Sequence, residues 1–365
     1  MSKYVLIILW FGLMALLQLF IGGRREEKVF GVYENRTTPI CAMIIIFPLV
    51  WMAANRGTMA DTHMYLLSFR NMPTVLSEMS EYMTTVTKDK GFSAVSVLIR
   101  VFLGSNEIIY LLFFSLIHGF ALWFVYRKYS ESYLMSIFLF MVSTDFISWM
   151  CNGLRQFTAV TIVFAATTLM LKKKYFPLIL IILLASTMHQ TALLMIPFVF
   201  IAQGKAWNKR TLLFTLIVFA AVLYVDQFTN ILDSALYDTQ YANVVSDWTS
   251  WNDDGTNPIR VLVYSVPAIL AIIGYRHIRE EDDPIINFCA NMSVISTGLY
   301  LISMVTSGIF IGRLPIYASL YNYILLPWEI NHFFSKKTTQ AVKVLVIFFY
   351  LIFYYCQMHL TWGYI

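Results

Sequence analysis

The sequence predicts an all-α integral membrane protein with about twelve transmembrane helices. Of its 365 residues, 59% are hydrophobic and only 13% are charged. A soluble domain of this size could not cover its surface with so few charged groups. Nearly uncharged runs of about 17 or more residues recur along the chain, each long enough to cross about 30 Å of hydrocarbon. We therefore expect one transmembrane domain over residues 1–365.

The candidate spans are expected to be helices, because backbone polar groups that face lipid must be paired within the segment. The first span is longer than a signal-peptide core and lacks a small-x-small cleavage site, so we interpret it as a retained helix. The short pair 175–187 and 190–203 forms either a tight two-helix hairpin or a segment that enters and returns. In chain order the spans are 4–21, 38–54, 106–126, 132–150, 154–171, 175–187, 190–203, 211–226, 259–275, 285–305, 313–334 and 341–357.

Clusters of Lys and Arg fall between alternate spans, which places these loops on the cytoplasmic side. The other loops then face outward, among them two long ones at about 55–105 and 226–257. The first ends in 92–103, which is too short to span and is expected to lie at the interface as an amphipathic helix. The second is acidic and aromatic, without Lys or Arg. The basic clusters are Arg24/Arg25/Lys28/Arg36, Arg127/Lys128, 172–174, Lys205/Lys209/Arg210, Arg276/Arg279 and Lys336/Lys337.

The charge and cysteine patterns argue against several classes of protein. The net charge is +5, but the basic residues sit in short clusters between apolar runs, which does not favour a nucleic-acid partner. Four scattered cysteines predict neither a disulfide framework nor a metal site. Asp253 and Asp254 in the acidic loop lack the spacing of a defined ion site, so we expect no metal and no cofactor.

Ionisable residues beside apolar spans are costly, so each is a candidate for a functional site. Arg155 stands at the outer end of a span, where spacings of three and four put Asn152, Arg155 and Gln156 on one helical face. The planar guanidinium matches phosphate oxygens, which predicts a substrate clamp. The alternative is an interfacial Arg that reaches lipid headgroups.

A second candidate stripe begins at Arg313, with Tyr317 and Tyr321 following at spacings of four. On one continuous helix each ring would lie about 6 Å below the one before it. This arrangement suits an anionic lipid-linked substrate, with the charge at headgroup level and the rings below. An ordinary aromatic interface belt is the alternative.

Three further candidates lie in turns on the outward side. His189 is at the turn of the short pair 175–203 and can exchange a proton near neutral pH, or it bridges two helices structurally. Asp61 acts as a base on a sugar hydroxyl or holds Arg56 in a salt bridge. Asp89, before the interfacial helix, binds the acceptor or caps that helix.

Together these residues resemble the EpsG/Wzy-like family of exopolysaccharide and O-antigen polymerases. The matches keep the order of the family over about 33–330, and Lys90 departs from the pattern, which has a neutral residue there. They are Arg56 with Asp61-Thr62 and Tyr65, the acid-x-Gly-aromatic run 89–92, Arg155-Gln156, His189 before Thr191-Ala192, and Arg313 with Tyr317.

The resemblance implies a GT-C-like, glycosyltransferase-type polymerase at the outer face of a bacterial inner membrane. Such an enzyme joins undecaprenyl-diphosphate-linked oligosaccharides, with a flippase or a chain-length regulator as potential partners. It would place Arg155, Arg313 and His189 in the active site. The two Arg side chains would stabilise the departing diphosphate without a metal, and His189, ahead of Asp61, would accept the proton of the acceptor hydroxyl.

Two other functions compete with polymerisation. A flippase or transporter of lipid-linked saccharides would show internal repeats and ionisable or broken helices at the membrane midplane. We see no clear two-fold repeat, and the polar candidates gather at the outer ends of helices. An acyltransferase would need a catalytic face open to a cytoplasmic acyl donor, where the loops offer no His–acid pair.

The alternating basic clusters make a direct prediction of topology. A cysteine introduced within 240–256 is expected to react with a membrane-impermeant thiol reagent added outside intact cells. Labelling is read by a mass shift, with a cysteine at Lys336 as the cytoplasmic control. Reaction at 240–256 only after permeabilisation would overturn the outward assignment of every candidate residue.

Overall fold

The computed structural model describes residues 3–21, 23–29, 32–237, 239, 242 and 255–364. The chain divides into two compact units, Met1–Leu193 with Ile330–Ile365, and Leu194–Glu329. Both are helical, which confirms the all-α prediction. Within the described ranges the only sheet is a hairpin that was not predicted from the sequence, in which β1 (Arg24–Val29) pairs antiparallel with β2 (Val32–Thr37).

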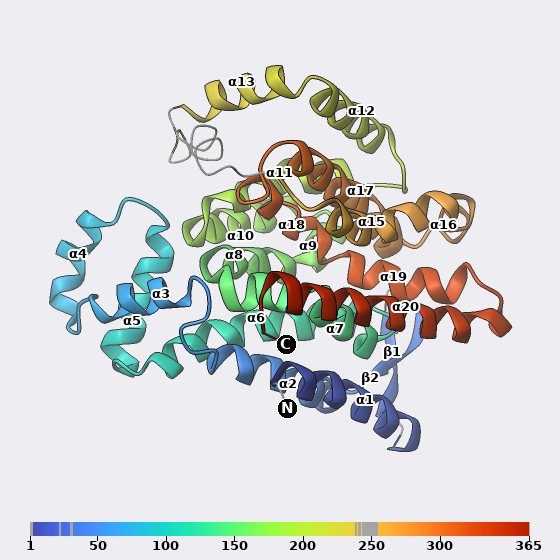
Figure 1. Ribbon diagram of the computed structural model, residues 1–365, viewed down its shortest axis with the longest axis horizontal. Coiled ribbons are helices and arrows are strands. Elements are labelled where there is room, and N and C mark those ends of the chain that lie inside the picture. The colour runs from blue at the N-terminus through green and yellow to red at the C-terminus, as the bar shows by residue number, and fades with distance from the viewer. Residues whose placement is uncertain are drawn as a thin grey trace. The chain divides into compact units, whose positions relative to one another are not determined.

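The first unit is built around α6 (Glu107–Tyr129), which packs against α2 (Pro39–Ala54) and α8 (Leu154–Ala165) (Figure 1). Helix α8 also packs against α10 (Tyr175–Met188). The other elements are α1 (Lys3–Ile21), α3 (Thr62–Arg70), a 3-10 turn Leu76–Glu78, α4 (Met79–Thr85), α5 (Lys90–Leu103), α7 (Tyr133–Val142), a π-helix Phe146–Asn152, α9 (Thr167–Leu171), a 3-10 turn Gln190–Leu194 at the unit boundary, α20 (Lys336–Cys356) and a π-helix Gln357–Thr361.

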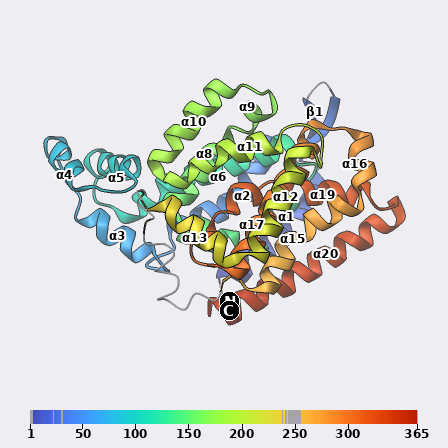
Figure 2. The same cartoon turned by 90° about the horizontal axis from the view of Figure 1, so that it is seen from above.

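The two ends of α6 meet different parts of the first unit. Helices α3, α4 and α5 gather near the end where α6 begins, and the β1–β2 hairpin lies at the opposite end in both views (Figures 1 and 2). The hairpin, which carries the first basic cluster, and the long loop 55–105 therefore lie at opposite ends of this unit. The alternating-loop topology requires such a separation.

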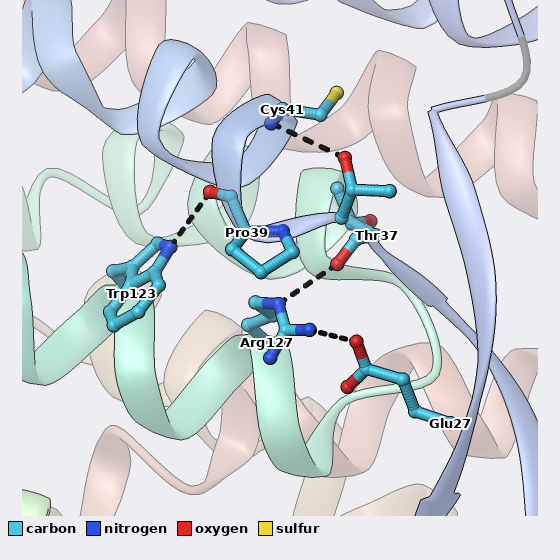
Figure 3. Close-up of polar contacts among 7 residues, drawn as sticks. Glu27, Thr37, Pro39, Cys41, Trp123 and Arg127 are labelled. Atoms are coloured by element: carbon cyan, nitrogen blue, oxygen red, sulfur yellow. Dashed lines mark hydrogen bonds and ion pairs between the residues drawn. The ribbon is translucent and has the colours of Figure 1, made fainter.

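Polar contacts fasten the hairpin to the last turns of α6 (Figure 3). Arg127 forms an ion pair with Glu27, and its Nε donates to the carbonyl oxygen of Thr37 at 3.0 Å. The indole Nε1 of Trp123 donates to the carbonyl oxygen of Pro39 at 3.2 Å. Arg127, which marks a predicted cytoplasmic loop, therefore also holds the hairpin against α6.

Several helices begin where the sequence supplies a cap. The side chain of Asn106 accepts two backbone N–H bonds at the start of α6. The side chains of Thr38 and Asp283 each accept one such bond at the start of α2 and α17, with Pro39 and Pro284 at the first helical position. Such side chains satisfy N–H groups that have no partner within the helix, and proline there loses no hydrogen bond.

The second unit is centred on α17 (Pro284–Val305), which packs against α11, α12, α15 and α18. Asn287 and Asn291 on α17 accept the backbone N–H groups of Ala206 at 2.7 Å and Trp207 at 2.9 Å, which fixes the loop before α12. The other elements are α11 (Met195–Ala202), α12 (Lys209–Leu223), α13 (Val225–Leu236), α15 (Pro258–Ile273), α16 (Tyr275–Glu281), a 3-10 turn Ile311–Arg313, α18 (Ile316–Ser319) and α19 (Asn322–His332), whose last three residues belong to the first unit.

The helices follow the predicted spans, although several of those spans are bent. In the part of the chain that the structure describes, three helices are long and apolar enough to cross a membrane, and six if each of three bent pairs forms one span. Five further apolar helices are shorter. The count of about twelve and the GT-C-like arrangement stay predictions.

The acidic loop predicted at 226–257 is described only in part. Its first residues form α13, which bends by 106° from α12. Apart from Tyr237, the acidic and aromatic residues that follow α13 in this loop lie outside the described residues: Asp238, Tyr241, Asp247, Trp248, Trp251, Asp253 and Asp254.

Helix α5 approaches the end of α10 so closely that only glycine fits at position 91. A Cβ on Gly91 would lie 2.1 Å from Thr187 Oγ1 and 3.0 Å from the backbone carbonyl carbon of Thr187. Helix α5, predicted as an interfacial segment, is therefore held against α10.

We predict that Gly91→Ala will destabilise the protein by about 1–3 kcal/mol, because the added methyl overpacks a contact made partly of backbone. Thermal unfolding of the purified chain measures the effect. Gly12→Ala is the matched control, since a Cβ on this helical glycine would meet nothing within 4 Å. Equal melting temperatures for Gly91→Ala and Gly12→Ala would contradict the close packing of α5 on α10.

Candidate functional site

An ion pair between Asp89 and Arg155 joins two segments that lie far apart in the sequence. Nη1 of Arg155, in the first turn of α8, donates to Oδ2 of Asp89 at 2.8 Å. The Asp89 side chain is 6% exposed and that of Arg155 is 41% exposed. The carboxylate is thus anchored inside, while the guanidinium remains accessible from outside.

The groups around Asp89 shift the pKa of its carboxyl in opposite directions. Burial raises the pKa of its carboxyl above the ordinary value, and the Arg155 guanidinium, the backbone N–H of Gln190 and Lys88 pull the pKa back down. Oδ1 is buried, and no described residue forms a hydrogen bond of normal geometry with it. The charge of Asp89 therefore depends on Arg155.

Asp89 occupies the cap position of α5 but does not cap it, which corrects the structural role predicted for it. The residue adopts a left-handed conformation, with φ of 51°, and its side chain makes no bond to the first turn of α5. Asp tolerates this conformation better than most residues. Lys90, the departure from the family pattern, is exposed and leaves the contact with Arg155 undisturbed.

An aromatic ring lies against the guanidinium of the ion pair, and two buried rings pack behind it. The Arg155 guanidinium lies over the ring of Tyr65 on α3, with 5.8 Å between its central carbon and the ring centroid. Tyr65 meets Phe92 of α5 edge-on at 6.1 Å, and Phe92 stacks on Phe114 of α6 at 4.8 Å. Phe92 and Phe114 thus fix the Tyr65 ring, and the face of this ring attracts the Arg155 guanidinium electrostatically.

His189 lies next to the Gln190 amide that faces Asp89. It follows the last residue of α10, as the predicted turn requires, and is partly exposed. Its Nδ1 is 2.6 Å from the hydroxyl oxygen of Thr191, which orients the imidazole. His189 and Arg155 are thus brought to one region through Asp89 and Gln190.

Arg56 is buried and forms hydrogen bonds to residues near it in the chain. It is 4% exposed, its Nη1 donates to the carbonyl oxygen of Ala53 at 2.7 Å, and its Nε donates to Thr62 Oγ1 at 2.8 Å. Thr62 in turn donates to the carbonyl oxygen of Cys151 at 3.1 Å. Arg56 therefore ties the end of α2 to the residues before α8, and the predicted salt bridge to Asp61 is not formed.

Asp61 is exposed beside the same junction. Its backbone N–H donates to Asn152 Oδ1 at 2.9 Å. Asn152 ends the π-helix and α8 begins at Leu154, so the prediction that Asn152 shares a helical face with Arg155 and Gln156 is wrong. The chain bends by 83° between α7 and the π-helix, which a sequence periodicity does not reveal. Gln156 is buried, at 6% exposure.

Arg313 and Tyr317 belong to the second unit. Arg313 is exposed, and Tyr317 and Tyr321 are buried at 2% and 0%. The continuous helical stripe predicted for them is wrong, because Arg313 ends a 3-10 turn and Pro315 separates it from the four-residue α18. Proline has no N–H to continue a helical ladder from the preceding turn.

Two parts of this arrangement were not predicted from the sequence. The close approach of Gly91 to Thr187 could have been suspected from the acid-x-Gly pattern, since glycine often marks tight packing. The role of the Gln190 backbone N–H could not be predicted, because it does not depend on the side chain at that position.

Around Arg155, no three His, Cys or carboxylate side chains of the described chain lie close enough to share an ion.

A comparison with protein families matches most of the chain. The model of the EpsG family matches residues 40–362. This range contains every candidate residue of both units. No curated protein and no solved structure matches the chain.

Proposed function

Because the chain belongs to the EpsG family, we propose that it is a membrane polysaccharide polymerase whose active site surrounds Arg155. Membership of this family fits such a polymerase. The observation that carries the assignment is the accessible guanidinium of Arg155, held by the buried carboxylate of Asp89 at 2.8 Å. We further propose that the substrates are undecaprenyl-diphosphate-linked oligosaccharides, joined at the outer face of the bacterial inner membrane.

In the proposed reaction, the hydroxyl oxygen of the acceptor sugar attacks the anomeric carbon of the donor sugar. The bond from this carbon to the diphosphate oxygen breaks, and the lipid diphosphate leaves with the electron pair. Arg155 stabilises the charge that grows on the diphosphate, because its donors are positioned before the reaction. The acceptor proton passes to a general base, for which His189 and Asp61 are the candidates.

Asp89 has a positioning role in this scheme. A free Arg side chain loses rotamer freedom when it binds an anion, and this loss weakens binding. The pair with Asp89 and the ring of Tyr65 already restrict the guanidinium before substrate arrives. Arg313, which is exposed in the second unit, stays a proposed substrate-binding residue.

A flippase is the alternative function. It would move the lipid-linked saccharide without breaking a bond, and it would need polar groups distributed across the membrane. The first unit instead gathers Arg155, Asp89 and His189 near the end of α6 where α3–α5 lie. This one-sided placement supports group transfer over transport.

Arg155→Lys is expected to reduce surface polymer by about tenfold or more while protein levels remain near normal. Lys retains the positive charge but loses the bidentate fork, and a hydrogen bond to a charged group contributes about 1.5–3 kcal/mol. A gel of the surface polysaccharide should show single repeat units in place of a ladder. Arg70→Lys is the matched control, because Arg70 pairs with Glu107 on the exposed surface.

The same gel separates the two functions. Loss of a flippase would leave no repeat units at the cell surface, whereas loss of a polymerase leaves unjoined ones. A wild-type ladder in Arg155→Lys would remove Arg155 from the active site.

The two candidate bases are separated by His189→Gln and Asp61→Asn. Gln keeps hydrogen-bonding capacity but cannot accept the proton, so removal of a general base should lower in-vitro turnover by about 10²-fold with substrate still bound. If histidine is the base, wild-type turnover should also fall as the pH drops through about 6.5, where imidazoles ordinarily become protonated. Near-normal turnover of His189→Gln beside an inactive Asp61→Asn would assign the base to Asp61.

A further inference from the structure

An apolar groove runs along the first unit between α6, α8, α9 and α10. Its volume is about 810 Å³, within the range of roughly 300–1,000 Å³ common for ligand sites. Leu116, Phe120 and Leu184 in its walls are each more than half exposed, so the groove is open to the surroundings of the unit. In a membrane protein, such a surface faces lipid chains.

The wall formed by α6 is a single helical stripe that ends in a cation. It runs from Phe113 to Lys128, a distance of about 22 Å at 1.5 Å per residue. The apolar part of this stripe exceeds the depth of one bilayer leaflet, about 15 Å. An extended acyl chain of one leaflet therefore fits along it.

Lys128 closes the groove without an acidic partner. Its Nζ donates to Thr168 Oγ1 at 3.1 Å and lies over the rings of Phe124 and Tyr129 at 5.5 and 5.2 Å. None of its contacts within the described chain is a carboxylate. An ammonium group has three donors, so two remain for a ligand beyond Thr168.

We propose that this groove binds one acyl chain of an anionic phospholipid, whose phosphate pairs with Lys128. A zwitterionic lipid also carries a phosphate, but its own ammonium group offsets that charge, so an anionic headgroup is expected to pair with Lys128 more favourably. A lysine that only reaches the headgroup layer needs no groove of this size beneath it. Basic sites between transmembrane helices are known to favour anionic headgroups.

This lipid site is distinct from the proposed catalytic site. Lys128 is in the last turn of α6, next to Arg127, which pairs with Glu27 of the hairpin, whereas Arg155 pairs with Asp89 directly before α5. Helix α5 and the hairpin lie at opposite ends of α6 (Figures 1 and 2). The phosphate at Lys128 would thus belong to a structural lipid and not to the saccharide carrier bound at Arg155.

Native mass spectrometry of the purified full chain tests the proposal with two probes, phosphatidylglycerol and phosphatidylcholine of identical acyl chains. Wild-type protein should retain one phosphatidylglycerol and bind phosphatidylcholine more weakly. Lys128→Gln should weaken phosphatidylglycerol binding by about fivefold, the size expected for one lysine at an anionic lipid surface. Lys173→Gln is the control, because it removes an equal charge from an exposed position outside the groove.

A second variant tests the groove itself. Ala165→Phe places a ring in the groove and should reduce retention of both lipids, with thermal unfolding as the check on folding. Unchanged phosphatidylglycerol binding in Lys128→Gln, or equal retention of the two lipids by wild-type protein, would overturn the proposal. Displacement of phosphatidylglycerol by equimolar undecaprenyl phosphate would also overturn it, because the groove would then serve the saccharide carrier.

Discussion

The arrangement of the first unit depends on a buried carboxylate that needs a cation. Asp89 is 6% exposed, and a carboxylate buried to this degree is stable only when it is paired. Arg155 supplies that charge from the start of α8, and the Gln190 amide adds a favourable dipole from the end of α10. One constraint thus brings together three segments that span a hundred residues of sequence.

Glycine packing and aromatic contacts complete the constraint. Gly91 lets α5 approach Thr187 on α10, while the guanidinium lies over the ring of Tyr65 and Phe92 packs against that ring. Each residue of the acid-x-Gly-aromatic run therefore has a structural role. Asp89 pairs with Arg155, Gly91 allows α5 to contact α10, and Phe92 packs against Tyr65. The exposed part of Arg155 is what this assembly presents to a substrate.

The sequence predicted features that depend on local pattern and missed those that depend on tertiary contact. Apolar runs located the apolar helices, because span length and hydrophobicity are set by the membrane, but they did not locate the more polar α3, α4, α13 and α16. The stripe from Arg313 failed because Pro315 interrupts it, which the sequence could have shown. The ion pair between Asp89 and Arg155 could not be predicted, since nothing local to Asp89 distinguishes a helix cap from a distant partner. The hairpin β1–β2 was not predicted, because its basic residues were interpreted only as a marker of a cytoplasmic loop.

Binding of undecaprenyl diphosphate to the purified chain in lipid nanodiscs is the most direct measurement of the central claim, that Asp89 holds Arg155 ready for an anionic substrate. Wild-type protein should bind this lipid without any acceptor, and Asp89→Asn, which leaves the Arg155 side chain intact, should weaken binding about tenfold. A loss of this size corresponds to about 1.4 kcal/mol, near the value of one hydrogen bond to a charged group. Binding by Asp89→Asn and by Arg155→Lys that is as tight as wild type would contradict the account.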